Sequence, residues 1–77
     1  MPHISIKMLE GRSEEEKALA VQKVTQAICE AFGCPDIYVS VAVKDYTPQE
    51  WQEVFAEEIQ GSGDLRKKPG YDPRDLL

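Results

Sequence analysis

Residues 2–13 read PHISIKMLEGRS, and this stretch contains the pattern of a strand, a turn and the start of a helix. Its apolar residues Ile4, Ile6 and Met8 alternate with polar ones, which is the two-residue period of a β-strand. Gly11 then interrupts the alternation. The stretch therefore predicts an N-terminal strand that ends in a short turn before a helix.

A long amphipathic helix is predicted to follow the turn. Ser13 and Glu16 have the three-residue spacing of a capping box, which satisfies backbone N–H groups at a helix start. The helix should run to Phe32, because Gly33 is the residue type that commonly follows a helix C-cap. Its apolar residues recur every three or four positions and form one core-facing stripe: Leu19, Ala20, Val21, Val24, Ala27, Ile28, Ala31 and Phe32.

A second strand is predicted over residues 37–43, where β-branched residues alternate with smaller or polar ones. Strand, helix and strand then make one βαβ unit, whose right-handed crossover makes the two strands parallel. The predicted fold class is α/β, or α+β. A two-stranded parallel sheet is not stable alone, so the sheet should be completed by oligomerisation.

A second, shorter helix is predicted after this unit. Thr47 and Glu50 form another capping box, and Pro48 suits the first helical turn. The helix should end near Gln60, and residues 61–77 form an irregular C-terminal tail. With 77 residues and no internal repeat, the chain is predicted to be a single domain, residues 1–77.

Composition excludes several classes of function. The net charge of -5 disfavours binding to nucleic acid or to anionic membranes, because both need a basic surface. No segment reads as a signal peptide or a membrane span, so a cytoplasmic location is expected. Cys29, Cys34 and His3 are too few to form an ordinary four-ligand zinc site, so no metal is expected.

The N-terminal pattern resembles the 4-oxalocrotonate tautomerase family, because Pro2 stands on the first strand and Leu-Glu-Gly-Arg-Ser follows at residues 9–13. The resemblance covers most of the chain and implies a tautomerase-like fold. Lys-Lys-Pro-Gly-Tyr at residues 67–71, together with Trp51, resembles the longer, dimeric branch of the family with phenylpyruvate-type tautomerase activity.

The resemblance also implies a set of site residues. The catalytic proline of the family falls on Pro2, which becomes an N-terminal amine once Met1 is removed, and the first substrate-binding arginine falls on Arg12. Ser40 stands where the best-known members have a second arginine, and an aromatic position of the site maps to Trp51. Each of the last two has a structural alternative: Ser40 as a small strand residue and Trp51 as a core anchor.

The expected function is a keto-enol tautomerase, an isomerase that needs no cofactor. Pro2 would act as general acid/base on a small, aromatic α-keto acid, and Arg12, Ser40 and Trp51 would bind the substrate. The partners expected are this small molecule and further copies of the chain, with a homodimer favoured over a hexamer. The alternative is a catalytically silent oligomeric module that keeps the fold and binds a small carboxylate.

Overall fold

The computed structural model describes residues 1–77, which divide into two compact units, Met1–Asp45 and Tyr46–Leu77. The first unit contains one strand, a long helix, a 3₁₀ turn and a second strand. These elements are β1 (His3–Leu9), α1 (Glu14–Phe32), η1 (Asp36–Tyr38) and β2 (Ser40–Tyr46). No helix of the chain is both long and apolar enough to cross a bilayer.

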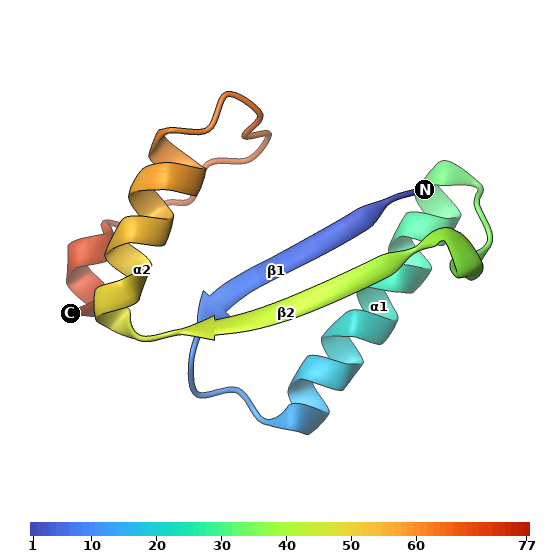
Figure 1. The fold of residues 1–77 in the computed structure, drawn as a ribbon, viewed down its shortest axis with the longest axis horizontal. Helices are drawn as coiled ribbons and strands as arrows, with labels where there is room; N and C mark the ends of the chain where they lie inside the picture. The colour runs from blue at the N-terminus through green and yellow to red at the C-terminus, as the bar shows by residue number, and fades with distance from the viewer. The chain divides into compact units, whose positions relative to one another are not determined.

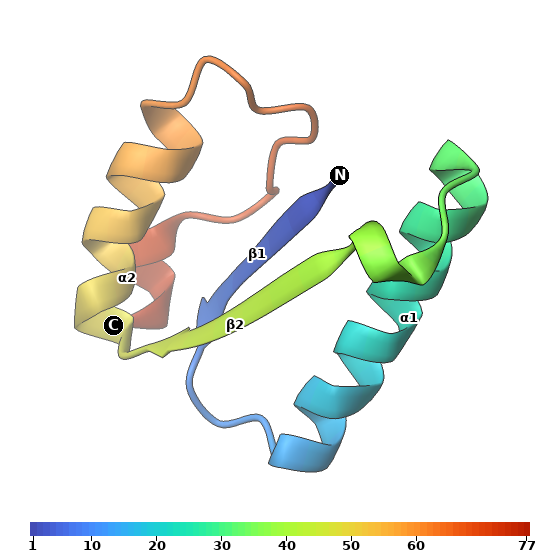
Figure 2. The same cartoon turned by 45° about the vertical axis from the view of Figure 1, so that its right-hand side comes forward.

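The two strands pair directly in a two-stranded sheet. They point the same way, and α1 runs along one face of the sheet (Figure 1), so the predicted parallel βαβ unit is confirmed. The view turned by 45° shows the same arrangement (Figure 2). The backbone N–H of Ser40 donates to the carbonyl oxygen of Pro2 at 3.2 Å, so the two strands begin side by side.

Helix α1 begins and ends where the sequence predicts. The Ser13 hydroxyl oxygen accepts from the Glu16 N–H at 3.1 Å, and the Ser13 N–H donates to the Glu16 carboxylate at 3.0 Å. At the other end Gly33 has a φ of 65°, a left-handed conformation that costs glycine little, and its N–H donates to the carbonyl of Cys29. Local hydrogen bonds thus define both ends of the helix.

The second strand lies three residues further along the chain than the predicted 37–43. Residues 36–38 instead form the 3₁₀ turn η1, in which the Tyr38 N–H donates to the Pro35 carbonyl at 3.2 Å. Ile37 is consequently 80% exposed instead of lying in the sheet. A local turn therefore replaces the first part of the predicted strand, although its side chains alternate.

The second unit consists of a helix and the tail. Helix α2 (Pro48–Val54) begins at the predicted capping box of Thr47 and Glu50, and it continues as a π-helical turn, η2 (Phe55–Gln60). The predicted helix is therefore confirmed as helical, with wider turns in its second half. The tail ends in a short 3₁₀ segment, η3 (Pro73–Leu76).

Burial within one copy of the chain is slight. Trp51 and Phe55, both in the second unit, are its only buried hydrophobic residues, at 8% and 6% exposure. Phe32 and Leu19 of α1 keep 67% and 51% of their surface exposed. Apolar surface of this kind in a small chain is typical of a protein that associates with other copies.

Candidate functional site at the ends of the sheet

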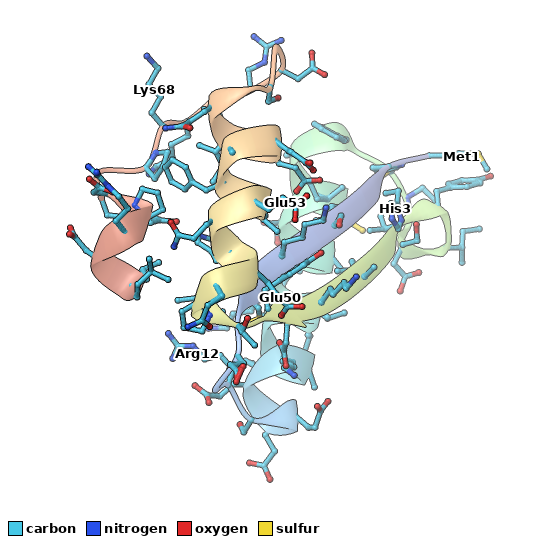
Figure 3. The ribbon with its side chains drawn as sticks, turned by 60° about the vertical axis from the view of Figure 1, so that its left-hand side comes forward. Met1, His3, Arg12, Glu50, Glu53 and Lys68 are labelled. Atoms are coloured by element: carbon cyan, nitrogen blue, oxygen red, sulfur yellow. The ribbon has the colours of Figure 1, made fainter.

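Pro2 lies immediately before β1, at the end of the sheet where both strands begin. It is half-buried, and its carbonyl oxygen is held by the N–H of Ser40. Met1 precedes it and is 96% exposed (Figure 3). While Met1 is attached, the Pro2 nitrogen is an amide without useful basicity, and removal of Met1 converts it into a secondary amine.

Ser40 is the first residue of β2 and lies beside the start of β1. Its Oγ is 2.6 Å from Nδ1 of His3, the first residue of β1. Pro2, His3 and Ser40 therefore gather at one end of the sheet. The sequence predicted Pro2 and Ser40 as site residues but not His3. The only indication for His3 in the sequence was its position next to Pro2.

Arg12 lies at the other end of β1, in the loop that leads into α1 (Figure 3). The seven residues of β1 span roughly 23 Å at about 3.3 Å each. The Arg12 side chain is 65% exposed, and one guanidinium nitrogen lies 3.4 Å from the Glu16 carboxylate. Water screens so exposed a pair, so the guanidinium remains available to an anion. Within one copy, the structure separates Arg12 from Pro2.

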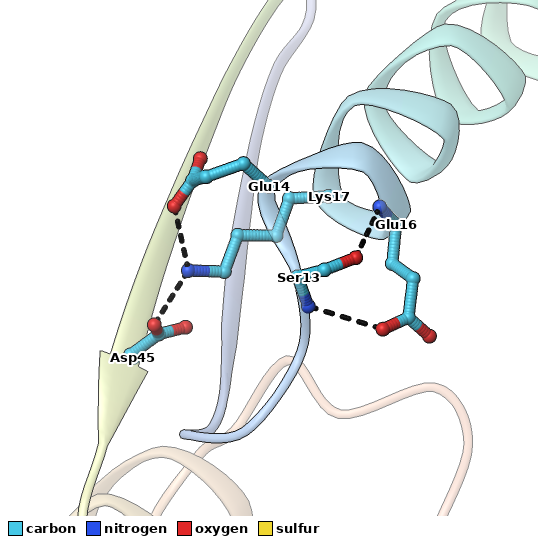
Figure 4. A network of polar contacts seen from close by, with 5 residues as sticks. All are labelled: Ser13, Glu14, Glu16, Lys17 and Asp45. Atoms are coloured by element: carbon cyan, nitrogen blue, oxygen red, sulfur yellow. Dashed lines mark hydrogen bonds and ion pairs between the residues drawn. The ribbon is translucent and has the colours of Figure 1, made fainter.

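A small cavity of about 210 Å³ lies beside Arg12, between the sheet and the first turns of α1. Its lining combines apolar and charged side chains: Ile6, Met8, Val43, Ala20, Arg12, Glu16 and Lys17. Lys17 is held in place, because its ammonium donates to the Asp45 carboxylate at 2.6 Å and to Glu14 at 3.4 Å (Figure 4). The bond to Asp45 raises the pKa of Lys17. Because Lys17 is paired with Asp45 and Glu14, the exposed guanidinium of Arg12 is the cation of this lining that remains available to an anionic ligand.

Trp51 lies in the second unit, where it is largely buried. Its indole N–H donates to the Tyr71 hydroxyl at 2.8 Å, and its ring meets Tyr46 edge-on at 6.1 Å. Tyr71 also meets Phe55 edge-on at 5.5 Å, so the tail closes over α2. These contacts make Trp51 a core anchor of its unit. They leave its proposed contact with substrate as a prediction.

Polar contacts at the start of α1 and in the C-terminal tail predict how stability depends on pH. Hydrogen bonds from Ser13 lower the pKa of Glu16, and those from Arg74 lower the pKa of Asp72 to about 2. Both carboxylates therefore stabilise the fold above their unfolded pKa values of about 4, and this contribution is lost as pH falls through the folded values. Lys17, whose pKa is raised, stabilises the fold until pH passes about 10. We expect the free energy of unfolding to change little through these groups between pH 5 and 9, and to fall in acid.

Urea unfolding at a fixed protein concentration, repeated from pH 2 to 9, measures this dependence. Glu16→Gln is the matched control, because glutamine keeps the capping box but does not ionise. Its curve should be flatter in acid than that of the unchanged chain. Identical acid slopes in the two proteins would show that Glu16 contributes nothing to the dependence.

Comparison with known proteins gives the chain close relatives. Residues 2–54 match the family described as tautomerase enzyme. A probable tautomerase from Xylella fastidiosa is 38% identical over 73 residues, which are 92% of this chain and 89% of that protein. A 2-hydroxymuconate tautomerase from Comamonas testosteroni is 47% identical over 51 residues, 66% of this chain and 81% of that protein.

A solved structure is also similar. It belongs to the 4-oxalocrotonate tautomerase isozymes of Methylibium petroleiphilum and superposes with a TM-score of 0.62 at 42% identity. The superposition covers 65% of this chain and 81% of that one. The family match begins at Pro2 and also contains Arg12, Ser40 and Trp51, so all four predicted site residues lie inside it.

Proposed function

The chain belongs to the tautomerase family, and from this premise we propose that it is a cofactor-independent keto-enol tautomerase acting on a small α-keto acid. Pro2, freed by removal of Met1, is the general acid/base. The observation that carries the proposal is the backbone hydrogen bond from Ser40 to Pro2, which places these two residues side by side at one end of the sheet. Residues 1–77 act together as one tautomerase domain.

The Pro2 amine suits this reaction because it can take a proton and return it. Ketonisation delivers a proton to the enol carbon while the enol oxygen loses one, and the reverse reaction moves both protons back. Simple α-amino groups titrate near about 7.7–8.0, and a prolyl amine is more basic. A cation and apolar surroundings near the nitrogen would lower its pKa towards neutrality, where a general base works best.

The remaining residues bind and orient the substrate. Arg12 holds the carboxylate, a contact that can be bidentate and that places the reacting carbon at the proline nitrogen. The Ser40 hydroxyl donates to the oxygen on which negative charge develops. Trp51 supplies an apolar wall for an aromatic substrate. Its contacts with Tyr46 and Tyr71 support this role, because they make it part of an aromatic cluster.

Such a site requires two copies of the chain. A small α-keto acid is far shorter than β1, so it cannot touch Pro2 and Arg12 of the same copy. A second copy related by two-fold symmetry, with its β1 antiparallel, brings Arg12 of the partner subunit to Pro2 and creates two equal sites. We propose a homodimer of the longer branch of the family, because the match to the Xylella protein extends over 73 residues.

Mixing two inactive forms tests both the activity and the shared site. One form keeps Met1 attached to Pro2, and the other carries Arg12→Ala with Pro2 free. Ketonisation of enol phenylpyruvate is followed for each form alone and after the two are unfolded and refolded together. In a shared site the hybrid dimer regains one intact site, so the mixture should reach about a quarter of the unmodified activity.

Arg12→Ala alone should lose roughly 10- to 100-fold in kcat/KM, because a charged hydrogen bond contributes about 1.5–3 kcal/mol. A mixture no more active than the sum of its parts would place Pro2 and Arg12 in one copy and reject the shared site. Lack of ketonisation by the unmodified chain with free Pro2 would reject this substrate class.

The second candidate is the catalytically silent carboxylate-binding module. The cavity beside Arg12 favours it, because that cavity is complete within one copy and does not use Pro2. Calorimetric titration of phenylpyruvate into the form that retains Met1 distinguishes the binding module from the enzyme. Binding that depends on Arg12, without turnover after Met1 is removed, would support the module and reject the enzyme.

A further inference from the structure

His3 is the group in contact with Ser40 that the proposed mechanism has not used. Its Nδ1 lies 2.6 Å from the Ser40 Oγ, a short distance even for hydrogen bonds to a hydroxyl. The two side chains come from different strands, and the backbone bond from Ser40 to Pro2 holds those strands together at this point. The pair therefore stands next to the proposed acid/base, at the same end of the sheet.

The direction of this hydrogen bond decides what Ser40 can do. A serine hydroxyl has one hydrogen to donate and two lone pairs that accept. If Nδ1 of His3 accepts that hydrogen, none remains for the substrate oxygen. If Nδ1 carries the hydrogen and donates it, the Ser40 hydroxyl keeps its own hydrogen for the substrate.

We propose that His3 is a positioning residue of the tautomerase, in which Nδ1–H donates to Ser40 Oγ and directs the Ser40 hydroxyl at the enolate oxygen of the substrate. The inference rests on the proposed function. Hydrogen bonds in a chain polarise one another, so the imidazole makes Ser40 a better donor as charge develops on the substrate oxygen. His3 thus strengthens a neutral contact without touching the substrate.

Two substitutions of His3 separate the hydrogen bond from the bulk of the ring. His3→Asn places an amide nitrogen near the position of Nδ1 and can still donate to Ser40, whereas His3→Leu cannot. We expect His3→Leu to lower kcat roughly tenfold with little change in KM, because it removes one hydrogen bond that acts in the transition state. His3→Asn should recover most of that loss. Ser5→Ala, which removes a serine hydroxyl from the same face of β1, should leave kcat unchanged.

A double-mutant cycle with Ser40→Ala shows whether His3 acts through Ser40. In the Ser40→Ala background, His3→Leu should cause no further loss of kcat, because the residue it positions is already gone. An equal loss in both backgrounds would instead indicate that His3 supports the local structure or Pro2, and it would overturn the proposal. If His3→Leu keeps full activity while retention of Met1 still abolishes it, the role of His3 is rejected and the proposed function stands.

Nitrogen NMR of the unmodified chain gives a readout that needs no turnover. The ¹⁵N shifts of His3 distinguish a protonated Nδ1 from an unprotonated one, and we expect the protonated form. An unprotonated Nδ1 would show that Ser40 donates to His3, and this would overturn the proposal whether or not the chain is a tautomerase.

Discussion

Retention of Met1 on Pro2 is expected to reduce kcat/KM for the ketonisation of enol phenylpyruvate by roughly 10²–10⁴-fold, the usual contribution of a positioned general acid/base. The reason is that an amide nitrogen cannot accept the proton that the reaction moves. Met1 is almost fully exposed, so its attachment does not disturb the packing of the fold. Mass spectrometry of each preparation establishes whether Met1 is present before the rates are compared.

Pro2→Ala, prepared with Met1 removed, is the matched control for the identity of the amine. It keeps a free N-terminal amine but loses the ring that fixes its direction, so a smaller loss is expected than for the blocked form. The pH profile of kcat/KM should also move, because a primary amine is less basic than a prolyl one. Equal rates for the free, blocked and alanine forms would remove Pro2 from the mechanism.

Trp51→Ala is expected to lower the free energy of unfolding by about 3–5 kcal/mol, the usual cost of truncating a buried tryptophan. The indole is 8% exposed, contacts Tyr46 and holds the Tyr71 hydroxyl, so its removal leaves a cavity and releases the tail. Because Trp51 is the only tryptophan, its fluorescence disappears with it. Urea unfolding should therefore be followed by far-ultraviolet circular dichroism.

Tyr71→Phe is the control for Trp51→Ala. It removes the hydroxyl that accepts from the indole but keeps the ring that packs against Phe55, so about 1 kcal/mol is expected. Unchanged stability in Trp51→Ala would mean that the second unit does not depend on this aromatic contact. A Trp51→Ala protein that stays folded but loses affinity for aromatic substrates would instead favour the pocket role of the indole.

The elements of this fold were predictable because their signals are local. Ser13 and Glu16 stand three residues apart, and the alternation before Gly11 belongs to a single strand, so neither feature depends on distant residues. The position of the second strand was wrong, because the hydrogen bond from Tyr38 to Pro35 replaces part of an alternating pattern that reads equally well as a strand.

The contacts of the site were harder to predict from the sequence, because they join residues far apart in the chain. His3 and Ser40 meet only when β1 and β2 pair in one particular register, which no spacing in the sequence states. Tyr71 reaches Trp51 across 20 residues that include an irregular tail. Residue types predicted which chemistry the chain can perform, whereas strand pairing decided which side chains adjoin Pro2.

The separation of Pro2 and Arg12 along β1 also affects how copies of this chain can diverge. Pro2 stands at one end of β1 and Arg12 beyond the other, so under the proposed pairing each chain contributes half of two different sites. After a gene duplication, one copy could lose the proline and the other the arginine, and a mixed pair would still contain one working site. Neither copy could then function alone, so two redundant genes would become mutually dependent, and selection would retain both.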